Sequence, residues 1–154
     1  MSRRRDERGV VAGLEGLVFG VLVLMAGTVL VVDAWSVLDT RSSLDGAARE
    51  YLRAYTEAAD PRTAADEGDR AARGALDGRG TVPAVRITAP DPGRFGPCAR
   101  AEVELAATVP AVRLPFVGDF GTTEIRVRHA ELVDAHREVS SGADYDPADT
   151  PCGD

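Results

Sequence analysis

The stretch Val10-Val-Ala-Gly-Leu-Glu-Gly-Leu-Val-Phe-Gly-Val-Leu-Val-Leu-Met-Ala-Gly-Thr-Val-Leu-Val-Val32 carries a single charge, Glu15, in 23 residues. As an α-helix it would be about 35 Å long, enough to cross a hydrocarbon core about 30 Å thick. A helix on the surface of a soluble domain needs a polar face, and this stretch has none along its length. We therefore expect residues 10–32 to form a single transmembrane helix.

The charges on either side of this helix predict its orientation. The first charged residues after it are acidic, Asp33 and Asp39. The arginines before it are Arg3, Arg4, Arg5 and Arg8. Because arginines in short flanking segments stay in the cytoplasm, residues 1–9 are expected to be cytoplasmic and residues 33–154 extracytoplasmic. The alternative is a cleaved secretory signal, but its apolar region would be much longer than the usual 7–15 residues.

Two features of the apolar helix bear on association with other helices. Its glycines fall on one side of a helical wheel: Gly9, Gly13, Gly16, Gly20 and Gly27. Such a stripe lets two helix backbones approach closely in lipid, although glycine is also common in membrane helices in general. Glu15 lies about 120° from the stripe, and an ionisable group there either pairs with a neighbouring chain or extends to the cytoplasmic headgroups.

The remainder of the chain predicts a small α+β domain. Apolar residues at helical spacing continue through residues 41–59, so residues 33–60 are expected to be a stem helix that extends the transmembrane helix. Asp60-Pro61 should end it, because proline disfavours helical geometry in the preceding residue. Residues 61–80 predict a short helix and a linker, with Gly78 and Gly80 ending the helix.

From residue 81 to residue 139 the apolar residues alternate as in strands, which predicts an antiparallel sheet of about three strands with the stem helix on one face. The alternation slips by one residue near His129, which indicates a β-bulge. The apolar connection 110–121 is expected to be a loop that lies on the membrane surface or against a partner. Residues 140–154, rich in Gly, Asp and Pro, are expected to be an acidic disordered tail.

The composition and the polar residues limit the function. The net charge of −7 and the absence of a basic patch argue against a nucleic-acid partner. We find no catalytic motif, no metal-binding pattern, no cofactor-binding motif and no small-molecule substrate site; His129 and His136 match no common zinc spacing and are interpreted as structural. The two cysteines, Cys98 and Cys152, both fall in the exported part, where a disulfide between them is favoured over two free thiols.

Several segments in order resemble the TadE-like pseudopilins, which are membrane-anchored minor components of tight-adherence (Flp) pilus machines. The resemblance begins at Arg8-Gly9 before an apolar helix with an early Glu15, and it continues through Leu44-Asp-Gly-Ala-Ala-Arg49. It extends over Gly96-Pro-Cys98, Val109-Pro-Ala-Val-Arg-Leu-Pro115 and a last strand ending near Val133, which is nearly the whole chain except the tail.

The resemblance implies a pilin-like fold and a role in pilus assembly or adhesion at the cell envelope. It implies as partners the other subunits of a pilus or secretion machine, including a second copy of the chain or a paralogous pseudopilin. It also implies Gly9 as a site of prepilin-type processing. Processed members usually carry Glu as the fifth residue of the mature chain, whereas Glu15 is the sixth residue after Gly9, so either processing tolerates the shift or the chain is not cut. A membrane-anchored extracytoplasmic binding domain unrelated to pili is the alternative.

Overall fold

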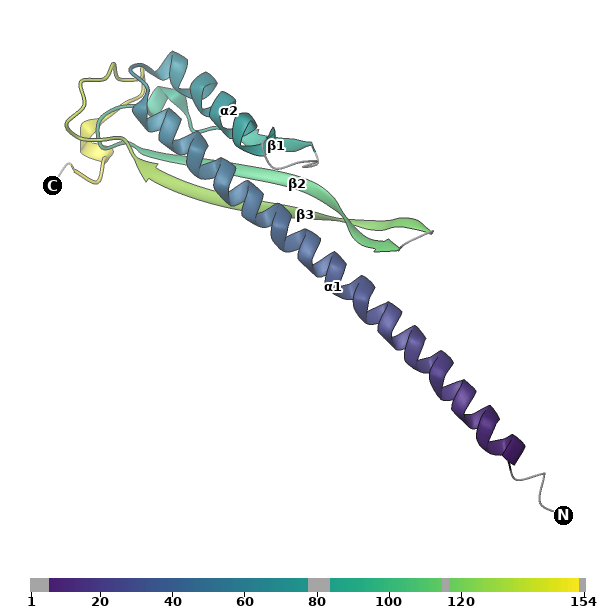
Figure 1. Ribbon diagram of the computed structural model, residues 1–154. Helices are drawn as coiled ribbons and strands as arrows, with labels where there is room; N and C mark the ends of the chain where they lie inside the picture. The colour runs from purple at the N-terminus through teal and green to yellow at the C-terminus, as the bar shows by residue number, and fades with distance from the viewer. Residues whose placement is uncertain (1–5, 78–83, 115–116, 153–154) are drawn as a thin grey trace.

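In the computed structural model, residues 6–77, 84–114 and 117–152 are described, with side chains in the first helix described from Glu15 onward. The elements follow the order α1 (Asp6–Glu57), α2 (Pro61–Asp77), β1 (Val85–Thr88), η1 (Pro92–Arg94), β2 (Arg100–Leu114), β3 (Gly118–Leu132) and η2 (Pro147–Asp149), where η denotes a short 3₁₀ helix. One very long helix therefore carries a small domain at its C-terminal end (Figure 1). The fold is α+β, with a three-stranded antiparallel sheet.

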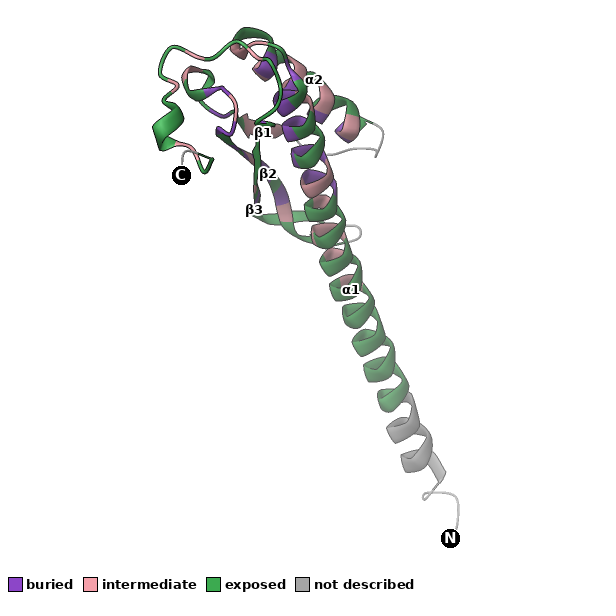
Figure 2. Ribbon diagram, turned by 90° about the vertical axis from the view of Figure 1, so that its left-hand side faces the viewer, coloured by how far each residue is buried: buried purple, intermediate pink, exposed green. Residues whose placement is uncertain are grey.

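The two halves of α1 have opposite environments. The helix is continuous over 52 residues. From Glu15 to Leu38 nearly all of its side chains are exposed, including large apolar ones, whereas buried positions begin at Ser43 and Leu44 (Figure 2). The N-terminal half is long and apolar enough to cross a membrane and is compatible with single-pass anchoring, and its apolar window has no cover within the described structure. The same helix thus serves as a bare apolar rod and as the central element of a folded domain.

The C-terminal half of α1 supplies most of the helical side of the core. Tyr51, Leu52 and Tyr55 are almost completely buried on it, together with Leu44, Ala47 and Ala48. The helical spacing of apolar residues predicted this buried stripe. α1 ends at Glu57, and just beyond its end Ala58 is buried whereas Ala59, the last residue of the range 41–59, is exposed. The ring of Tyr55 meets Phe95 edge-on at 5.4 Å between centroids, and this contact joins the helix to η1.

Asp60 caps the N-terminus of α2, and Gly68 allows α2 to pack closely on α1. The Asp60 carboxylate accepts hydrogen bonds from the backbone N–H groups of Arg62 and Thr63, at 2.9 and 3.1 Å, as an N-cap residue does. Pro61 at the first helical position suits this start, because its missing N–H would have no helical partner. Gly68 faces Tyr51 so closely that a Cβ at this position would lie 2.8 Å from the Tyr51 Cζ atom. Gly78 and Gly80, which were expected to end the helix, lie outside the described residues.

The sheet has the order β1-β2-β3, and both pairs are antiparallel. Its core side chains alternate along β2, where Ala101, Val103, Leu105, Ala107 and Val109 are buried. On β3 the buried residues are Ile125 and Val127. These residues meet the C-terminal half of α1, which contacts both β2 and β3. The predicted cover of the sheet by the stem helix is therefore what the structure has.

The bulge predicted near His129 is wrong. The pairing of β2 with β3 keeps one register across this region, with Val103 opposite His129 and Glu102 opposite Ala130. His129 continues the helix-facing side of β3, where its Nε2 atom lies 3.0 Å from the Asp45 Oδ1 atom of α1. The alternation of apolar residues is interrupted because His129, a polar residue paired with Asp45, occupies an inward position. The register of the backbone is unchanged there.

The loop predicted at residues 110–121 is also wrong. In the structure, β2 continues to Leu114 and β3 begins at Gly118, with Val112 paired to Phe120. The two strands thus form a hairpin arm, defined here as residues 110–114 and 117–122, which extends beyond the core along α1 toward its N-terminal half (Figure 1). The period-2 signal was absent because side chains on both faces of the arm are exposed or only partly covered, so no alternation is imposed.

The acidic tail is ordered against the domain over the part that the structure describes, which corrects the expectation of disorder at residues 140–152. Backbone N–H groups of Ser140, Gly142 and Asp144 donate to the carbonyls of Ala59, Phe95 and Gly93, at 3.0, 2.7 and 2.8 Å. The Tyr145 hydroxyl donates to the Pro97 carbonyl at 2.7 Å. Specific backbone pairing therefore overrides a composition typical of disordered segments.

Candidate interaction surfaces

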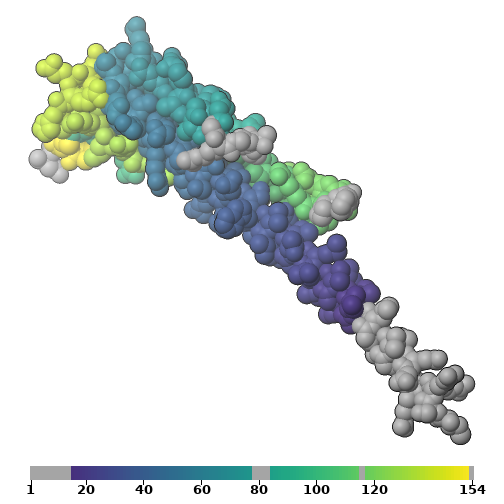
Figure 3. Space-filling view, viewed as in Figure 1, coloured from purple at the N-terminus to yellow at the C-terminus, as the bar shows by residue number. Residues whose placement is uncertain are grey.

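The exposed N-terminal part of α1, residues 15–38, is called the bare half here. It carries the residues that the sequence predicts to take part in helix association. A Cβ added at Gly16, Gly20 or Gly27 would meet nothing within 4 Å, so each of these glycines faces open space in the single chain. Glu15 is exposed as well. Gly9 and Gly13 lie in the helix, but the surroundings of their side chains are outside the described part. Figure 3 shows this half of the helix standing clear of the folded body.

The C-terminal end of the apolar run has neighbours that were not predicted from the sequence. Asp33, the first residue after the run, accepts a hydrogen bond through Oδ1 from the backbone N–H of Arg113 in the hairpin arm, at 3.1 Å. Trp35, two residues further on, is 72% exposed. Tryptophan is enriched at membrane–water interfaces, because its ring is apolar and its N–H is polar. The position of Trp35 just after the apolar run could have been recognised from the sequence. The contact of Asp33 with Arg113, 80 residues away, could not.

The outer face of the sheet carries a ladder of ion pairs near its centre. Arg86 of β1 pairs with Glu124 at 2.6 Å, and Arg126 binds the same carboxylate. Arg128 pairs with Glu104 at 2.6 Å. Hydrogen bonding from Arg128 holds the pKa of Glu104 below its usual value, and Arg126 does the same for Glu124. Exposed pairs of this kind add little stability, so the ladder mainly keeps this face polar.

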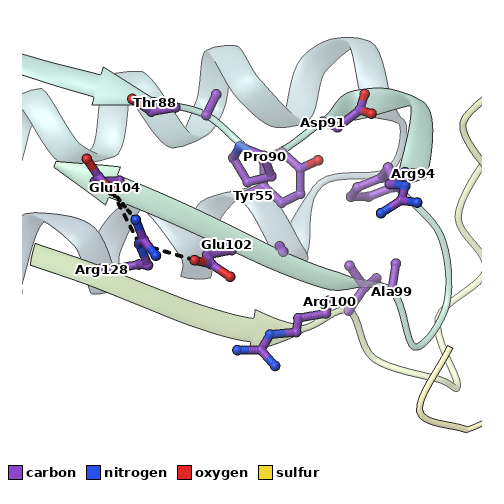
Figure 4. Close-up of a pocket in the computed structure, with 14 residues that line it drawn as sticks. Tyr55, Thr88, Pro90, Asp91, Arg94, Ala99, Arg100, Glu102, Glu104 and Arg128 are labelled. Carbon is purple, nitrogen blue, oxygen red and sulfur yellow. Dashed lines mark hydrogen bonds and ion pairs between the residues drawn. The ribbon is translucent and has the colours of Figure 1, made fainter.

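A groove of about 530 Å³ opens between the end of β1, η1 and the start of β2. Tyr55 and Phe95 are among its lining residues, and Arg94 and Arg100 lie at its edge (Figure 4). The lining also contains Glu102 and Glu104, both of which are bound by Arg128. Because Arg128 pairs with both carboxylates, the groove presents a mixed polar rim beside the aromatic side chains of Tyr55 and Phe95.

The two histidines lie in different parts of the domain and make different contacts. His129 is partly buried and paired with Asp45, as already described, whereas His136 lies in a turn after β3 and its backbone N–H donates to Asp134 Oδ1 at 2.8 Å. Within the ranges that the structure describes, no three His, Cys, Asp or Glu side chains gather in a way that could hold a metal ion.

The two cysteines are brought together. Cys98, just before β2, is joined to Cys152 near the C-terminus by a disulfide, with their Cα atoms 5.8 Å apart. Close contacts continue along the same segment, because Gly96 leaves room for the Tyr145 ring. The disulfide and this ring together fix the end of the chain beside η1 and the start of β2.

Comparisons of the chain with protein-family models, with curated proteins and with solved structures found no match.

Proposed function

We propose that this protein is a membrane-anchored assembly subunit, resembling the TadE-like pseudopilins, of a tight-adherence-type pilus or secretion machine. The observation that carries the proposal is the division of α1. One continuous helix is bare and apolar over its N-terminal half and is built into the core of a folded domain over its C-terminal half. A subunit of this shape can join neighbours in the membrane while it presents a rigidly connected domain outside it.

The helix association rests on the exposed glycines. A Cβ added at Gly16, Gly20 or Gly27 would meet no atom within 4 Å among the described residues, so a second helix could approach the backbone there without displacing any described part of the fold. In lipid, such close approach is favoured by van der Waals packing rather than by the hydrophobic effect. The partners we propose are a second copy of the chain, a paralogous pseudopilin or another subunit of the machine.

The orientation we propose places the N-terminus in the cytoplasm and the sheet domain outside. It is supported by the arginines before the helix, and the disulfide suits an oxidising compartment. A reporter active only in the cytoplasm, fused after Asp154, should be silent, and the same reporter fused before Met1 should be active. The reverse pattern would refute the orientation and the pilus proposal with it.

The experiment that tests the function is deletion of the gene followed by complementation with the full chain. Loss of surface pili or of adhesion, restored by the chain, supports the assembly subunit. Unchanged piliation and adhesion would refute it and favour the second candidate, a membrane-anchored extracytoplasmic binding domain. The polar-rimmed groove beside η1 is the observation that favours this second candidate. Neighbouring genes for a secretion ATPase and a prepilin peptidase would support the first.

A further inference from the structure

The hairpin arm is held at a defined height along α1. His129 of β3 is paired with Val103 of β2 and contacts Asp45 of α1. Further along β2, the backbone of Arg113 contacts Asp33 of α1. Because the contact moves from residue 45 to residue 33, the arm runs toward the N-terminus of α1. Its end therefore lies at or beyond the level of Asp33, where the apolar run of the helix finishes.

The side chains of the arm change character along the same direction. Even-numbered residues of β2 and β3 point away from the core, and over the centre of the sheet they are the charged members of the ion-pair ladder. In the arm the same face carries Val112, Leu114 and Phe120, which are 40%, 37% and 48% exposed. Val117, at the turn, is 67% exposed. One face of the sheet is thus polar over the domain and apolar where it reaches the end of the apolar helix.

The surface of α1 near the arm is also apolar. Val31, Val32 and Trp35 are exposed at the same level of the helix. The charged groups on the arm pair with each other, with Arg113 Nε lying 3.7 Å from Asp119 Oδ1. The arm therefore has no net charge to attract an oppositely charged protein surface or an anionic headgroup. Its exposed apolar side chains instead lie near the level of α1 at which the apolar run ends, as the hydrogen bond between Arg113 and Asp33 shows.

We propose that the hairpin arm inserts its apolar side chains into the outer interface of the bilayer, as a second membrane contact beside the transmembrane helix. This inference rests on the membrane anchoring given under Proposed function. Its consequence is mechanical: two contacts, one through α1 and one through the arm, fix the tilt of the sheet domain relative to the membrane. A domain held in one orientation presents the same outer surface to every neighbouring subunit.

The test uses the full-length chain reconstituted in phosphatidylcholine vesicles, with fluorescence quenching by lipids brominated near the headgroup. The chain has one tryptophan, so Trp35→Phe gives a silent background. Phe120→Trp then reports on the arm. Leu132→Trp is the matched control, since Leu132 lies on the same face of the same strand and is 46% exposed, twelve residues away from Phe120. Those twelve residues place the control about 40 Å along the strand from Phe120.

Brominated lipid should reduce the emission of the Phe120→Trp chain at least twofold and leave that of the Leu132→Trp chain nearly unchanged. Equal, weak quenching of both would overturn the proposal. Emission at position 120 that is blue-shifted but unquenched, and that depends on the protein-to-lipid ratio, would also overturn it and show contact between copies. Phe19→Trp tests the anchor separately, with lipids brominated near the end of the acyl chain, because position 19 lies near the middle of the apolar run. Quenching at 19 by these lipids, without quenching at 120 by the headgroup-brominated lipids, rejects only the arm insertion, whereas no quenching at 19 rejects the membrane anchoring as well.

Discussion

The contact between Gly68 and Tyr51 allows the packing of α2 on α1 to be tested with a single methyl group. In Gly68→Ala, the new Cβ would lie 2.8–3.0 Å from three ring carbons of Tyr51, which is closer than carbon atoms can approach. The ring cannot move away freely, because it is fully buried and stacks on Tyr55 at 6.0 Å between centroids. Overpacking of a core in this way costs about 1–3 kcal/mol.

The same substitution at Gly74 supplies the control. Gly74 lies in α2 as well, is exposed, and would have nothing within 4 Å of an added Cβ. Replacing an exposed glycine in a helix by alanine should stabilise the protein by about 0.8–1.0 kcal/mol. Gly68→Ala receives the same helical gain, so we expect a net loss of up to about 2 kcal/mol there. The two variants should therefore differ by about 1–3 kcal/mol, which is the packing contribution alone.

Thermal unfolding of the full chain in detergent micelles, followed by near-ultraviolet circular dichroism of the tyrosines, measures the difference. For a domain of this size, 1 kcal/mol corresponds to a shift in Tm of about 4 °C. The Tm of Gly74→Ala should rise by about 4 °C, and that of Gly68→Ala should fall. If both variants gain stability equally, α2 does not pack on Tyr51 as the structure describes.

Three further predictions concern the folded domain. The double variant Cys98→Ser, Cys152→Ser opens a loop whose ends are 54 residues apart in sequence, and it should lower the free energy of unfolding by about 4 kcal/mol. Peptide mass spectrometry of the parent chain without reduction should find the two cysteines linked, and free thiols would contradict the pairing. Tyr51→Phe removes a buried hydroxyl without a hydrogen-bond partner among the described residues, so its Tm should be equal to or above that of the parent, and a large fall would contradict the assignment. Hydrogen bonding from the Thr63 N–H lowers the pKa of Asp60 below its ordinary value of 3.8. The stability that this cap contributes is therefore complete above pH 3.8 and is lost as the pH falls through the lowered pKa. Asp60→Asn should make Tm depend less on pH between about pH 5 and pH 2.5, and an unchanged dependence would exclude the cap as its cause.

The parts of the fold that were predictable from the sequence are those in which one periodic pattern determines one buried face. The helical spacing of Leu44, Tyr51 and Tyr55 predicted the core side of α1, and alternation along residues 103–109 predicted β2. The end of α1 and the start of α2 followed from Asp60-Pro61, because the capping and steric effects of these residues are local.

The failures have a common physical origin, since in each case the structure of a segment depends on its place in the fold, which the local sequence pattern does not record. His129 was misread because Asp45, its partner 84 residues away, cannot be found from spacing. The hairpin arm was misread because neither of its faces is packed into the core, so no alternation marks its strands. The C-terminal segment was misread because its order comes from pairing with residues 93–98 and not from its own composition.

The candidate surfaces divide in the same way. Gly16 and Gly20 were identified from the sequence, since a one-sided stripe is visible on a helical wheel, and in the described part of the structure an added Cβ at either position would meet nothing within 4 Å. The height of the hairpin arm relative to the apolar helix could not have been predicted. It depends on the hydrogen bond between Arg113 and Asp33, which only the folded domain creates.

The central claim is that the bare half of α1 is a helix for association and not only an anchor. Gly16→Leu and Gly20→Leu each place a side chain where two backbones would meet, and they disturb nothing in the single chain. Val21→Leu, at a neighbouring exposed position, is the control. Glu15→Ala adds a test of pairing between Glu15 and a neighbouring chain.

The measurement is chemical crosslinking of these chains in native membranes, with membrane insertion checked for each variant. The crosslinked fraction should fall severalfold for both glycine variants, should fall for Glu15→Ala while insertion is retained, and should be unchanged for Val21→Leu. If all four variants crosslink like the parent chain and piliation persists, the helix is a passive anchor and the proposed assembly role is wrong.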